Sequence, residues 1–390
     1  MVNRPFWKNL IEQAWERRSI VWLSGIRRAG KTNLCQSLPD IEYYDCELPL
    51  TRLQLENPEY FLNQKKHKRL VLDEIHRLNN PSEILKIAAD HYPDIKIVAT
   101  GSSTLNASRK FKDTLTGRKV EIWLTPMLLK ESVDFGNNDL SHRFLYGGLP
   151  PFFLSSLLPE RDYQEWLDAY WARDIQELFQ LGKRYSFLKF TEMILAQSGS
   201  IFEATRFAIP CEASRTTISN YLSVLEATFV AHIIRPFSQH RITEIVSAPK
   251  VYGFDTGFVC YCRGWASLRK EDMGLLWEHC VLNEILSRLQ MRKINYWRDK
   301  RGHEIDFIFI NKNQQTPCVI ECKWSANEFN PKNIQVFRSY YPIGQNLVVS
   351  PDIITPFDRN YREISVKFVN TQQLIEALYK TELPNEEKRN

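Results

Sequence analysis

The sequence predicts an α/β protein with more than one domain, and three observations point to this. The chain has 390 residues, which is long for a single hydrophobic core. Apolar, β-rich runs occur at 20–23, 70–72 and 95–100. The first of these runs leads into a glycine-rich turn and then a helix-like segment, an order that is typical of nucleotide-binding α/β domains.

The composition is that of a globular protein, with 43% hydrophobic residues, 25% charged residues and a net charge of +5. This mildly basic balance is compatible with nucleic acid but does not require it. No apolar run approaches the roughly 18 residues of a membrane span, and the N-terminal residues do not resemble a secretory signal. We therefore expect a cytoplasmic protein without membrane contact. The eight cysteines form no C-x-x-C pair, so reduced and mostly buried thiols are expected.

A phosphate-binding loop is predicted at residues 25–32. Its G-x-x-x-x-G-K-T pattern is made by Gly25, Gly30, Lys31 and Thr32, between a β-rich run and a helix-like run. The glycines allow backbone N–H groups to surround phosphate oxygens, and the start of the following helix adds positive potential. Lys31 is expected to contact the β- and γ-phosphates, and Thr32 to bind magnesium.

A second apolar run, 70–72, ends in two acidic residues. Asp73 is expected to hold magnesium through water, and Glu74 to polarise the attacking water. A glutamate directly after the aspartate favours hydrolysis over binding alone. A third apolar run ends in polar residues at 100–103, and any of these, Ser102 among them, could sense the γ-phosphate.

Five segments in this order, GIRRAGKT, VLDEIH, ATGSS, LTGR and YGGLPPFF, resemble a bacterial and archaeal family of AAA-type ATPases with a C-terminal nuclease-like domain of unknown function. The resemblance covers nearly the whole chain, and the double arginine Arg27-Arg28 within the phosphate loop is characteristic of the family. The second proline of YGGLPPFF departs from its usual pattern. The resemblance implies a P-loop AAA-type ATPase core at 1–150 that binds ATP or ADP with Mg²⁺, with Arg27 and Arg28 at the nucleotide.

Arg118 lies between a small-residue turn and a predicted strand. An arginine from a neighbouring subunit commonly stabilises charge during phosphoryl transfer, and Arg118 is our candidate for this arginine finger. A solvated surface arginine is the alternative. A finger that acts in trans requires a homo-oligomer, and the resemblance implies a hexamer as the common number.

The middle of the chain is predicted to be mainly helical. Residues 151–184 are expected to form a helical lid packed over the nucleotide. Residues 185–248 predict a winged helix-turn-helix, because three helix-like segments are followed by β-rich segments. The outer face of the third helix offers only Arg215 and Asn220 for reading bases, so contact with DNA would use mainly phosphates. Packing within an oligomer is the alternative role.

Residues 249–390 are assigned to a C-terminal α/β domain. In its long helix-like segment, Glu278 falls at the centre of an apolar face and Glu284 toward the edge of that face. An unpaired carboxylate on an apolar face is costly, so Glu278 needs a cation, a hydrogen-bond network or a metal ion.

A hairpin is predicted around the polar turn near Asn313. It places Asp306 across from Ile320 or Glu321, and Lys323 faces the same way as Glu321 because side chains alternate along a strand. Two carboxylates can hold a divalent metal, and a lysine can orient water or steady phosphoryl charge.

The set of Glu278, Asp306, Glu321 and Lys323 resembles the PD-(D/E)XK nuclease superfamily. The resemblance implies that Asp306 and Glu321 are metal ligands, that Lys323 is the catalytic lysine and that Glu278 is an outer or second ligand. A structural ion-pair cluster without activity is the alternative. The basic stretch 288–301 predicts a DNA-facing patch with Tyr296 and Trp297 as stacking groups, against the alternative of a solvated turn with a packed tryptophan.

Three functions remain open at this point. The first is an ATP-hydrolysing protein that processes DNA, branched DNA among the candidates, through a Mg²⁺-dependent nuclease-like domain. The second is an ATP-dependent motor that migrates or remodels branched DNA such as Holliday junctions, with a nuclease-like domain that binds but does not cut. The third is a nucleotide-switched signalling or defence scaffold.

Overall fold

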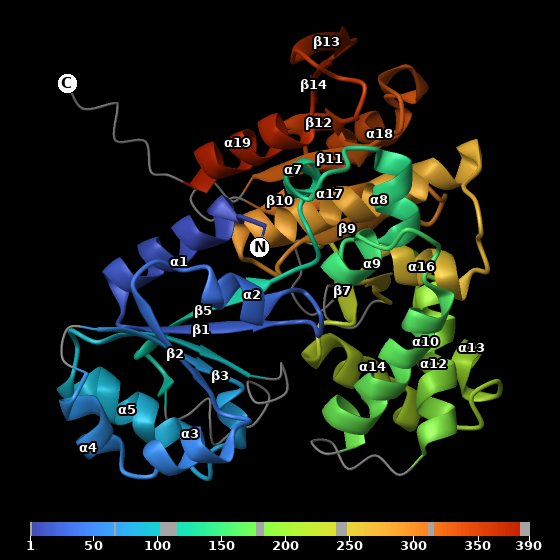
Figure 1. Ribbon diagram of the computed structural model, residues 1–390. Helices are drawn as coiled ribbons and strands as arrows, with labels where there is room; N and C mark the ends of the chain where they lie inside the picture. The colour runs from blue at the N-terminus through green and yellow to red at the C-terminus, as the bar shows by residue number, and fades with distance from the viewer. Residues whose placement is uncertain are drawn as a thin grey trace, which may run out of the picture. The chain divides into compact units, whose positions relative to one another are not determined.

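The computed structural model describes residues 2–65, 68–101, 115–176, 183–238, 248–310 and 316–382. The chain divides into two compact units (Figure 1). Unit 1 consists of Met1–Leu188 and Asn220–Val230, and unit 2 of Lys189–Ser219 and Ala231–Asn390. Each unit is described by itself.

Unit 1 contains a five-stranded parallel sheet in the order β2-β3-β4-β1-β5. The strands are β1 (Ile20–Gly25), β2 (Ile41–Asp45), β3 (Arg69–Asp73), β4 (Lys96–Thr100) and β5 (Lys119–Leu124). The β-rich runs expected from the sequence are β1, β3 and β4. Ligands of open parallel sheets bind beyond the carboxyl ends of the strands. The loops that follow β1 and β3 lie at this edge, so we expect them to form the binding site.

The three central strands β1, β3 and β4 are almost continuously apolar because both faces of the sheet are covered there. Every residue of β1 is buried, and its side chains join a core with residues of β3 and β4 such as Leu72 and Ile97. Gly25 ends β1 with φ +145°, and a Cβ atom there would lie 2.3 Å from the carbonyl oxygen of Leu124. Only glycine therefore allows β1 and β5 to approach this closely before the chain turns into the phosphate loop.

Five of the described helices of unit 1, namely α1, α3, α4, α5 and α9, begin at proline, which is favoured in the first helical turn. They are α1 (Pro5–Arg17), α2 (Lys31–Gln36), α3 (Pro49–Gln54), α4 (Pro58–Asn63), η1 (Ile75–Arg77), α5 (Pro81–His91), α7 (Leu129–Asp134), α8 (Leu140–Tyr146), α9 (Pro150–Phe153), α10 (Glu160–Ala169) and the π-helical segment η3 (Tyr170–Gln176). In α10 and η3 the buried side chains Trp166, Tyr170 and Trp171 recur at helical spacing, as the expected lid segment requires.

Unit 2 contains a nine-stranded mixed sheet in the order β13-β14-β12-β11-β10-β9-β7-β8-β6. The strands are β6 (Ser200–Ile201), β7 (Ala231–Pro236), β8 (Lys250–Gly253), β9 (Asn295–Arg298), β10 (Glu304–Ile310), β11 (Pro317–Cys322), β12 (Asn346–Val349), β13 (Phe357–Tyr361) and β14 (Ile364–Val369). Strands β10 and β11 form the expected antiparallel pair, and Phe307 lies opposite Ile320. The predicted register of this pair is thereby confirmed.

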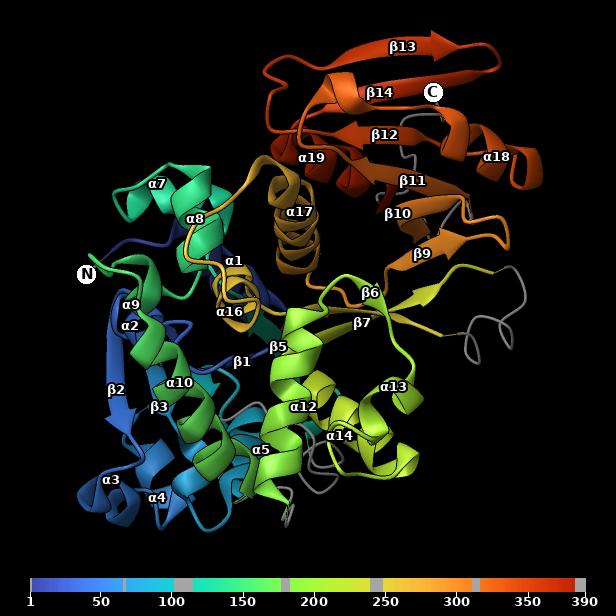
Figure 2. The ribbon, with the colours of Figure 1, turned by 90° about the vertical axis from the view of Figure 1, so that its right-hand side faces the viewer.

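Helices cover both faces of this sheet, and Figure 2 shows α17 on one side of strands β10–β12 and α18 on the other. The helices and helical turns are α13 (Ala204–Ala208), α16 (Thr256–Cys262), η4 (Lys270–Asp272), α17 (Met273–Leu289), η5 (Ala326–Glu328), α18 (Lys332–Tyr340) and α19 (Thr371–Glu382). Phe337 of α18 packs on sheet residues such as Ile308 and Val319. Two further helices, α12 (Arg184–Ala196) and α14 (Arg215–Ala227), have residues in both units.

The structure differs from the expected domain plan at one boundary. The limit between 248 and 249 falls between β7 and β8, which pair antiparallel, with Ile233 opposite Val251. Strand β7, one of the two β-rich segments expected in a separate wing, also pairs with β9, so it belongs to the same sheet as the C-terminal strands. The other expected segment, 241–247, lies outside the described residues. The three helices expected in 185–248 are present as α12, α13 and α14, and their action as a winged helix-turn-helix stays a prediction.

The long helix α17 differs from the expected helix with one apolar face, because it is buried on most sides. Glu284 is 2% exposed and pairs with Arg288 at 2.9 Å, whereas the Glu278 side chain retains 16% exposure. Glu284, expected toward the edge of the apolar face, is thus covered by protein as well and keeps its charge partner within the same helix. Within the described ranges, no helix combines the length and the apolar character that a bilayer crossing needs.

Candidate functional site

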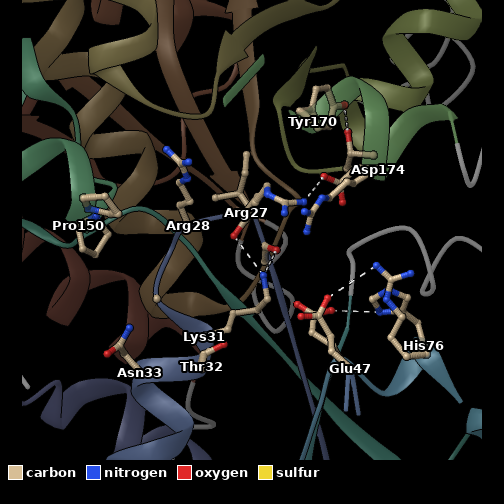
Figure 3. A pocket seen from close by; sticks show the side chains of 18 residues that line it. Arg27, Arg28, Lys31, Thr32, Asn33, Glu47, His76, Pro150, Tyr170 and Asp174 are labelled. Carbon is tan, nitrogen blue, oxygen red and sulfur yellow. Dashed lines mark hydrogen bonds and ion pairs between the residues drawn. The ribbon is translucent and has the colours of Figure 1, made fainter. Parts of the chain in front are cut away.

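A pocket of about 340 Å³ lies in unit 1 around the phosphate loop and the carboxyl ends of β1 and β3 (Figure 3). Seven of the residues assigned to the nucleotide from the sequence line it, namely Gly25, Arg27, Arg28, Gly30, Lys31, Thr32 and Glu74. Part of the wall comes from the segment expected to act as a lid, through Pro151, Tyr170, Arg173 and Asp174.

The phosphate loop is held by side chains from distant parts of unit 1. Arg4 is buried, donates to the carbonyl oxygen of Ala29 at 2.9 Å and pairs with Glu131 at 2.6 Å. Trp166 donates its indole N–H to the carbonyl oxygen of Arg27 at 3.2 Å. Lys31 donates to the carbonyl oxygens of Gly25 and Ile26 at 2.9 and 3.2 Å, contacts that close the loop on itself. Contacts within the protein therefore fix the conformation of the loop around Lys31.

Asp73 lies at the centre of a hydroxyl network behind the loop. Thr32 donates to its Oδ2 atom at 2.8 Å, and Tyr43 of β2 donates to the same atom at 2.6 Å. Thr100, at the end of β4, donates to Oδ1. Burial, followed by the hydrogen bond to Asp73, raises the pKa of Tyr43, so this phenol stays a donor. The threonine and the aspartate expected to serve magnesium are therefore side by side.

Glu74 projects from the end of β3 with a left-handed backbone conformation, φ +51°. Its N–H group donates to Thr100 Oγ1 at 3.0 Å, and its carboxylate lies 3.1 Å from Nδ1 of His76. Burial opposes the charge on Glu74, but the hydrogen bond from His76 and the charges of Lys31 and Arg27 outweigh it and lower the pKa of Glu74. Glu74 is therefore an ionised carboxylate at the pocket.

Arg27 and Asp174 point toward one another across the pocket in Figure 3 and lie 3.4 Å apart. Burial raises the pKa of Asp174, against the opposing charges of Arg27 and Lys31. The sequence marked Arg27 through the family resemblance, but no sequence pattern indicated which residue of the lid segment would meet it.

Asp73 lies behind the residues that line the pocket, and two further predicted residues remain. Ser102 lies outside the described residues. Arg118 is at the surface, where its Nε and Nη2 atoms bond Asp90 at 2.7 and 3.1 Å. Its role as a finger for a neighbouring subunit stays a prediction. Sequence reasoning missed Tyr43 and Arg4, since each is brought to the site by long-range packing. It also gave no role to His76, although this residue lies two positions after Glu74.

The second set of predicted residues meets in unit 2. Lys323 Nζ lies 2.7 Å from Glu321 Oε2 and 3.7 Å from Asp306 Oδ2. Asp306 Oδ2 also accepts the N–H of Cys322 at 2.8 Å, which fixes the aspartate against β11. Glu321 is 2% exposed, and its Oε1 atom has no hydrogen-bond partner.

Glu278 belongs to the same cluster but has partners of its own. Its Oε1 atom accepts the hydroxyl of Tyr252 and lies 3.8 Å from Nζ of Lys250, both on β8. Lys250 also pairs with Glu304 of β10. The sequence indicated no role for Lys250, Tyr252 or Glu304, because no spacing pattern links the strand near residue 250 to the acidic residues.

The electrostatics of the cluster follow from burial and crowded acids. Burial, followed by the charge of Asp306, raises the pKa of Glu321 to about 8 and that of Glu278 to about 7. Burial opposes the charge on Lys323, but Asp306 and Glu321 outweigh it and raise its pKa. In the described part of the chain, no group of three or more His, Cys, Asp or Glu side chains is placed to hold a metal ion. Metal binding by Glu278, Asp306 and Glu321 together therefore stays a prediction.

The predicted stacking patch is corrected by the structure. Tyr296 and Trp297 are 4% and 7% exposed in β9, where Tyr296 donates to the carbonyl oxygen of Ala248 and Trp297 packs edge-on against Phe337. They cannot stack on bases, because the strand is internal to the sheet. Arg288 is paired with Glu284. The packed-tryptophan alternative is the right one for Trp297.

Comparison with known families now identifies the first unit's core. Residues 17–133 match the model of an AAA domain family. The chain therefore carries an AAA-type ATP-binding domain, and the phosphate loop with Lys31 lies within the matched residues. Residues 137–269 and 273–373 match two families described as domains of unknown function, DUF8612 and DUF4143. The nuclease-like assignment of the C-terminal part gains no support from these matches.

The relatives are distant. A Mycobacterium tuberculosis protein described as uncharacterised is 26% identical over 338 residues, which are 81% of this chain and 75% of the relative. A Methanocaldococcus jannaschii protein, also described as uncharacterised, is 24% identical and covers 91% and 85% of the two chains. Among solved structures, a Walker-type ATPase of Pyrococcus abyssi is 18% identical, covers 67% of this chain and 96% of its own, and superposes with a TM-score of 0.45. That similarity is too low to carry an argument about function.

Proposed function

We propose that this protein hydrolyses ATP and uses the cycle to bind, remodel or process DNA, with a Mg²⁺-dependent nuclease-like centre in unit 2. The observation that carries the ATPase part is the contact between Thr32 and Asp73 in a pocket that Lys31 and Glu74 also reach. The family match supports an AAA domain. We propose in addition that the protein hydrolyses ATP, acts on DNA and carries a nuclease-like centre.

The nucleotide site fits ATP with Mg²⁺ by its donors. Thr32 and Asp73 supply adjacent oxygen atoms, which Mg²⁺ prefers, and Lys31 and Arg27 supply charge for the phosphates. Bound Mg²⁺ would neutralise charge on the phosphates. Lys31 would exchange its two carbonyl contacts for phosphate oxygens, and Glu74, kept ionised by His76, would accept a hydrogen bond from the attacking water.

The first test concerns nucleotide turnover. Lys31→Ala should lose ATP binding, because the pocket loses the cation nearest to the phosphates. Glu74→Gln should still bind ATP, but its hydrolysis rate should fall by at least roughly 100-fold, since only the water-polarising carboxylate is removed. Fluorescent-nucleotide binding and phosphate release measure the two steps separately. Normal turnover by Glu74→Gln would remove the assignment of Glu74 as the base.

The cluster in unit 2 fits a metal ion at one position. The Oε1 atom of Glu321 is buried without a partner, and Asp306 lies close enough to raise the pKa of Glu321. A cation that shares Asp306 and Glu321 would satisfy this atom, and in a nuclease it would stabilise charge on the phosphate. Lys323 would orient water or the phosphate beside it.

One specific observation favours the non-cutting alternative. Lys323 already lies against Glu321 and Asp306, an arrangement that a structural ion-pair cluster also produces. The remodelling motor with a DNA-binding but inactive nuclease-like centre therefore remains the second candidate function.

The experiment that separates these functions is a cleavage and binding panel. Labelled single-stranded, duplex, forked and four-way DNA would be incubated with Mg²⁺ or Mn²⁺, with and without ATP, and with Asp306→Ala as the matched control. Cutting that Asp306→Ala abolishes supports the nuclease-coupled function. Binding without cutting supports the remodelling motor. Neither cutting nor binding, with ATP turnover unaffected by DNA, contradicts a DNA role and leaves the signalling scaffold.

A further inference from the structure

Lys250 is a buried cation within the acidic cluster of unit 2. Its side chain is 5% exposed, pairs with Glu304 and lies 3.8 Å from Glu278. Its ammonium group also lies over the rings of Tyr296 and Tyr252, at 5.5 and 6.0 Å from their centroids. A lysine held by two carboxylates and two aromatic rings is well fixed, because each contact compensates part of its desolvation.

Tyr252 completes this arrangement from the same strand. Its hydroxyl donates to Glu278 Oε1, the same oxygen atom that faces Lys250. Side chains two residues apart on a strand share a face, so Lys250 and Tyr252 bind Glu278 together. Glu278 is thereby satisfied by protein groups.

The charges of the cluster leave room for one divalent cation. The carboxylates are Glu278, Glu304, Asp306 and Glu321, and the ammonium groups are Lys250 and Lys323. The guanidinium group of Arg298 also lies 3.7 Å from Glu304, but its side chain is 46% exposed, so solvent screens its charge and the sum is taken over the six more buried groups. Four negative and two positive charges give a net charge of −2 when all are ionised. A single divalent cation neutralises this sum, whereas two would leave an excess of two positive charges in a largely buried site.

The position for that cation is marked by an independent feature. Glu321 Oε1 is the buried carboxylate oxygen without a partner, while its other oxygen is bound by Lys323. Asp306 is the acid that shares Lys323 with Glu321, at 3.7 Å from the ammonium group.

We propose that the ammonium group of Lys250 takes the place of a second cation in this cluster, so that the cluster binds one divalent cation through Asp306 and Glu321. Glu278 and Glu304 then serve as positioning residues that hold Lys250. The inference rests on the metal-binding role proposed above, and it assigns Glu278 a different part from the ligand role that the sequence resemblance implied.

The test counts Mn²⁺ ions on the full-length, nucleotide-free protein by equilibrium dialysis and calorimetric titration. Asp306→Asn defines the Mn²⁺ that belongs to the cluster, since ions bound near Thr32 and Asp73 persist in that variant. The wild-type protein should bind one Asp306-dependent Mn²⁺ per chain. Glu321→Gln should lower the affinity for this Mn²⁺ ion by at least roughly 10-fold.

Variants of Lys250 separate a cation substitute from a structural lysine. Lys250→Met changes the net charge of the cluster to −3 and vacates the place between Glu278 and Glu304, so a second Mn²⁺ should bind. The double variant Lys250→Met/Glu278→Gln restores a net charge of −2 and keeps the hydrogen bond from Tyr252. It should keep one Mn²⁺ with an affinity loss smaller than roughly 10-fold, and it guards against misfolding of the single variant.

Three outcomes would overturn the inference and leave the proposed function untouched. They are two Asp306-dependent ions in the wild-type protein, one unchanged ion in a folded Lys250→Met protein, and a double variant that loses Mn²⁺ as Glu321→Gln does. None of these affects whether DNA is cut, which the cleavage panel decides. An absence of any Asp306-dependent Mn²⁺ overturns the inference together with the metal-dependent part of the proposed function.

Discussion

At the scale of single residues, Asp73 depends on three hydroxyl groups from separate elements. Thr32 and Thr100 belong to segments that the sequence marked, but Tyr43 comes from β2, for which no site motif was recognised. The phenol donates to the same carboxylate oxygen as Thr32. Tyr43 therefore fixes the rotamer of the carboxylate that is proposed to serve Mg²⁺.

Tyr43→Phe should raise the Mg²⁺ concentration that gives half-maximal ATP hydrolysis, by several-fold up to roughly 10-fold. The reason is that the ring stays in place while Asp73 loses one donor. ATP affinity measured without Mg²⁺ should not change. The control is Tyr44→Phe, because the Tyr44 hydroxyl bonds Glu42 and not Asp73. Equal Mg²⁺ requirements in the two variants would show that Tyr43 does not position Asp73.

The residues that sequence reasoning found are those whose chemistry is local. Lys31 and Thr32, and Asp73 and Glu74, are neighbours in the chain, so spacing alone marked them. The partners that order them, such as Arg4 and Tyr43, arrive through folding over tens of residues, and a lone arginine or tyrosine carries no spacing signal. Lys250 was missed for the same reason.

At the scale of elements, alternation gave the right register for β10 and β11 but not the surroundings of β9. The pairing of Phe307 with Ile320 follows from the length of the turn and the apolar pattern. The burial of Trp297 does not, because β9 becomes an internal strand only through its parallel pairing with β7, far upstream. Basic neighbours in sequence therefore suggested an exposed patch where the sheet has a core.

The start of α17 offers a test of pH-dependent stability. Asp272 is buried and accepts hydrogen bonds from the backbone N–H, Nε and Nη2 of Arg269. The Arg269 side chain is the main cause that lowers the pKa of Asp272 below its usual value near 3.8. A carboxyl group with a lowered pKa in the folded state stabilises the protein above that usual value, and this stability is lost as the pH falls through the folded-state pKa.

Asp272→Asn should therefore lower the free energy of unfolding in urea at about pH 7, and the difference from the wild-type protein should shrink at about pH 3. Glu271→Gln is the matched control, since Glu271 also pairs with Arg269 but is exposed, so its effect should be small at both pH values. A difference for Asp272→Asn that is equal at the two pH values would contradict the role of its charge.

At the scale of the whole molecule, the proposed arginine finger and the expected homo-oligomer depend on each other, because a finger that acts in trans needs a neighbouring subunit. Arg118 bonds Asp90 at the surface of its own chain, and it does not line the nucleotide pocket of that chain. A contribution to hydrolysis therefore requires the pocket of another chain. Asp90→Asn serves as a control, because it breaks the same ion pair and keeps the arginine.

Mixing two inactive variants tests this directly. Arg118→Ala lacks the finger and Glu74→Gln lacks the base, so each alone should hydrolyse ATP slowly. In a random mixed assembly, about a quarter of the pockets would combine an intact Glu74 with an Arg118 from the neighbour, and phosphate release should recover accordingly. No recovery in an assembly shown to exchange subunits, or full activity of Arg118→Ala alone, would remove Arg118 as a finger.

The division of the chain also constrains its synthesis on the ribosome. The nucleotide unit needs residues 220–230, and these follow a segment, 189–219, that belongs to the other unit. Phe229 stacks on Trp123 at 4.9 Å between centroids, and Thr228 bonds Tyr170. During synthesis from the N-terminus, the first unit therefore cannot complete its packing until residue 230 has emerged from the ribosome. Acquisition of nucleotide binding by a nascent chain would mark that moment of translation.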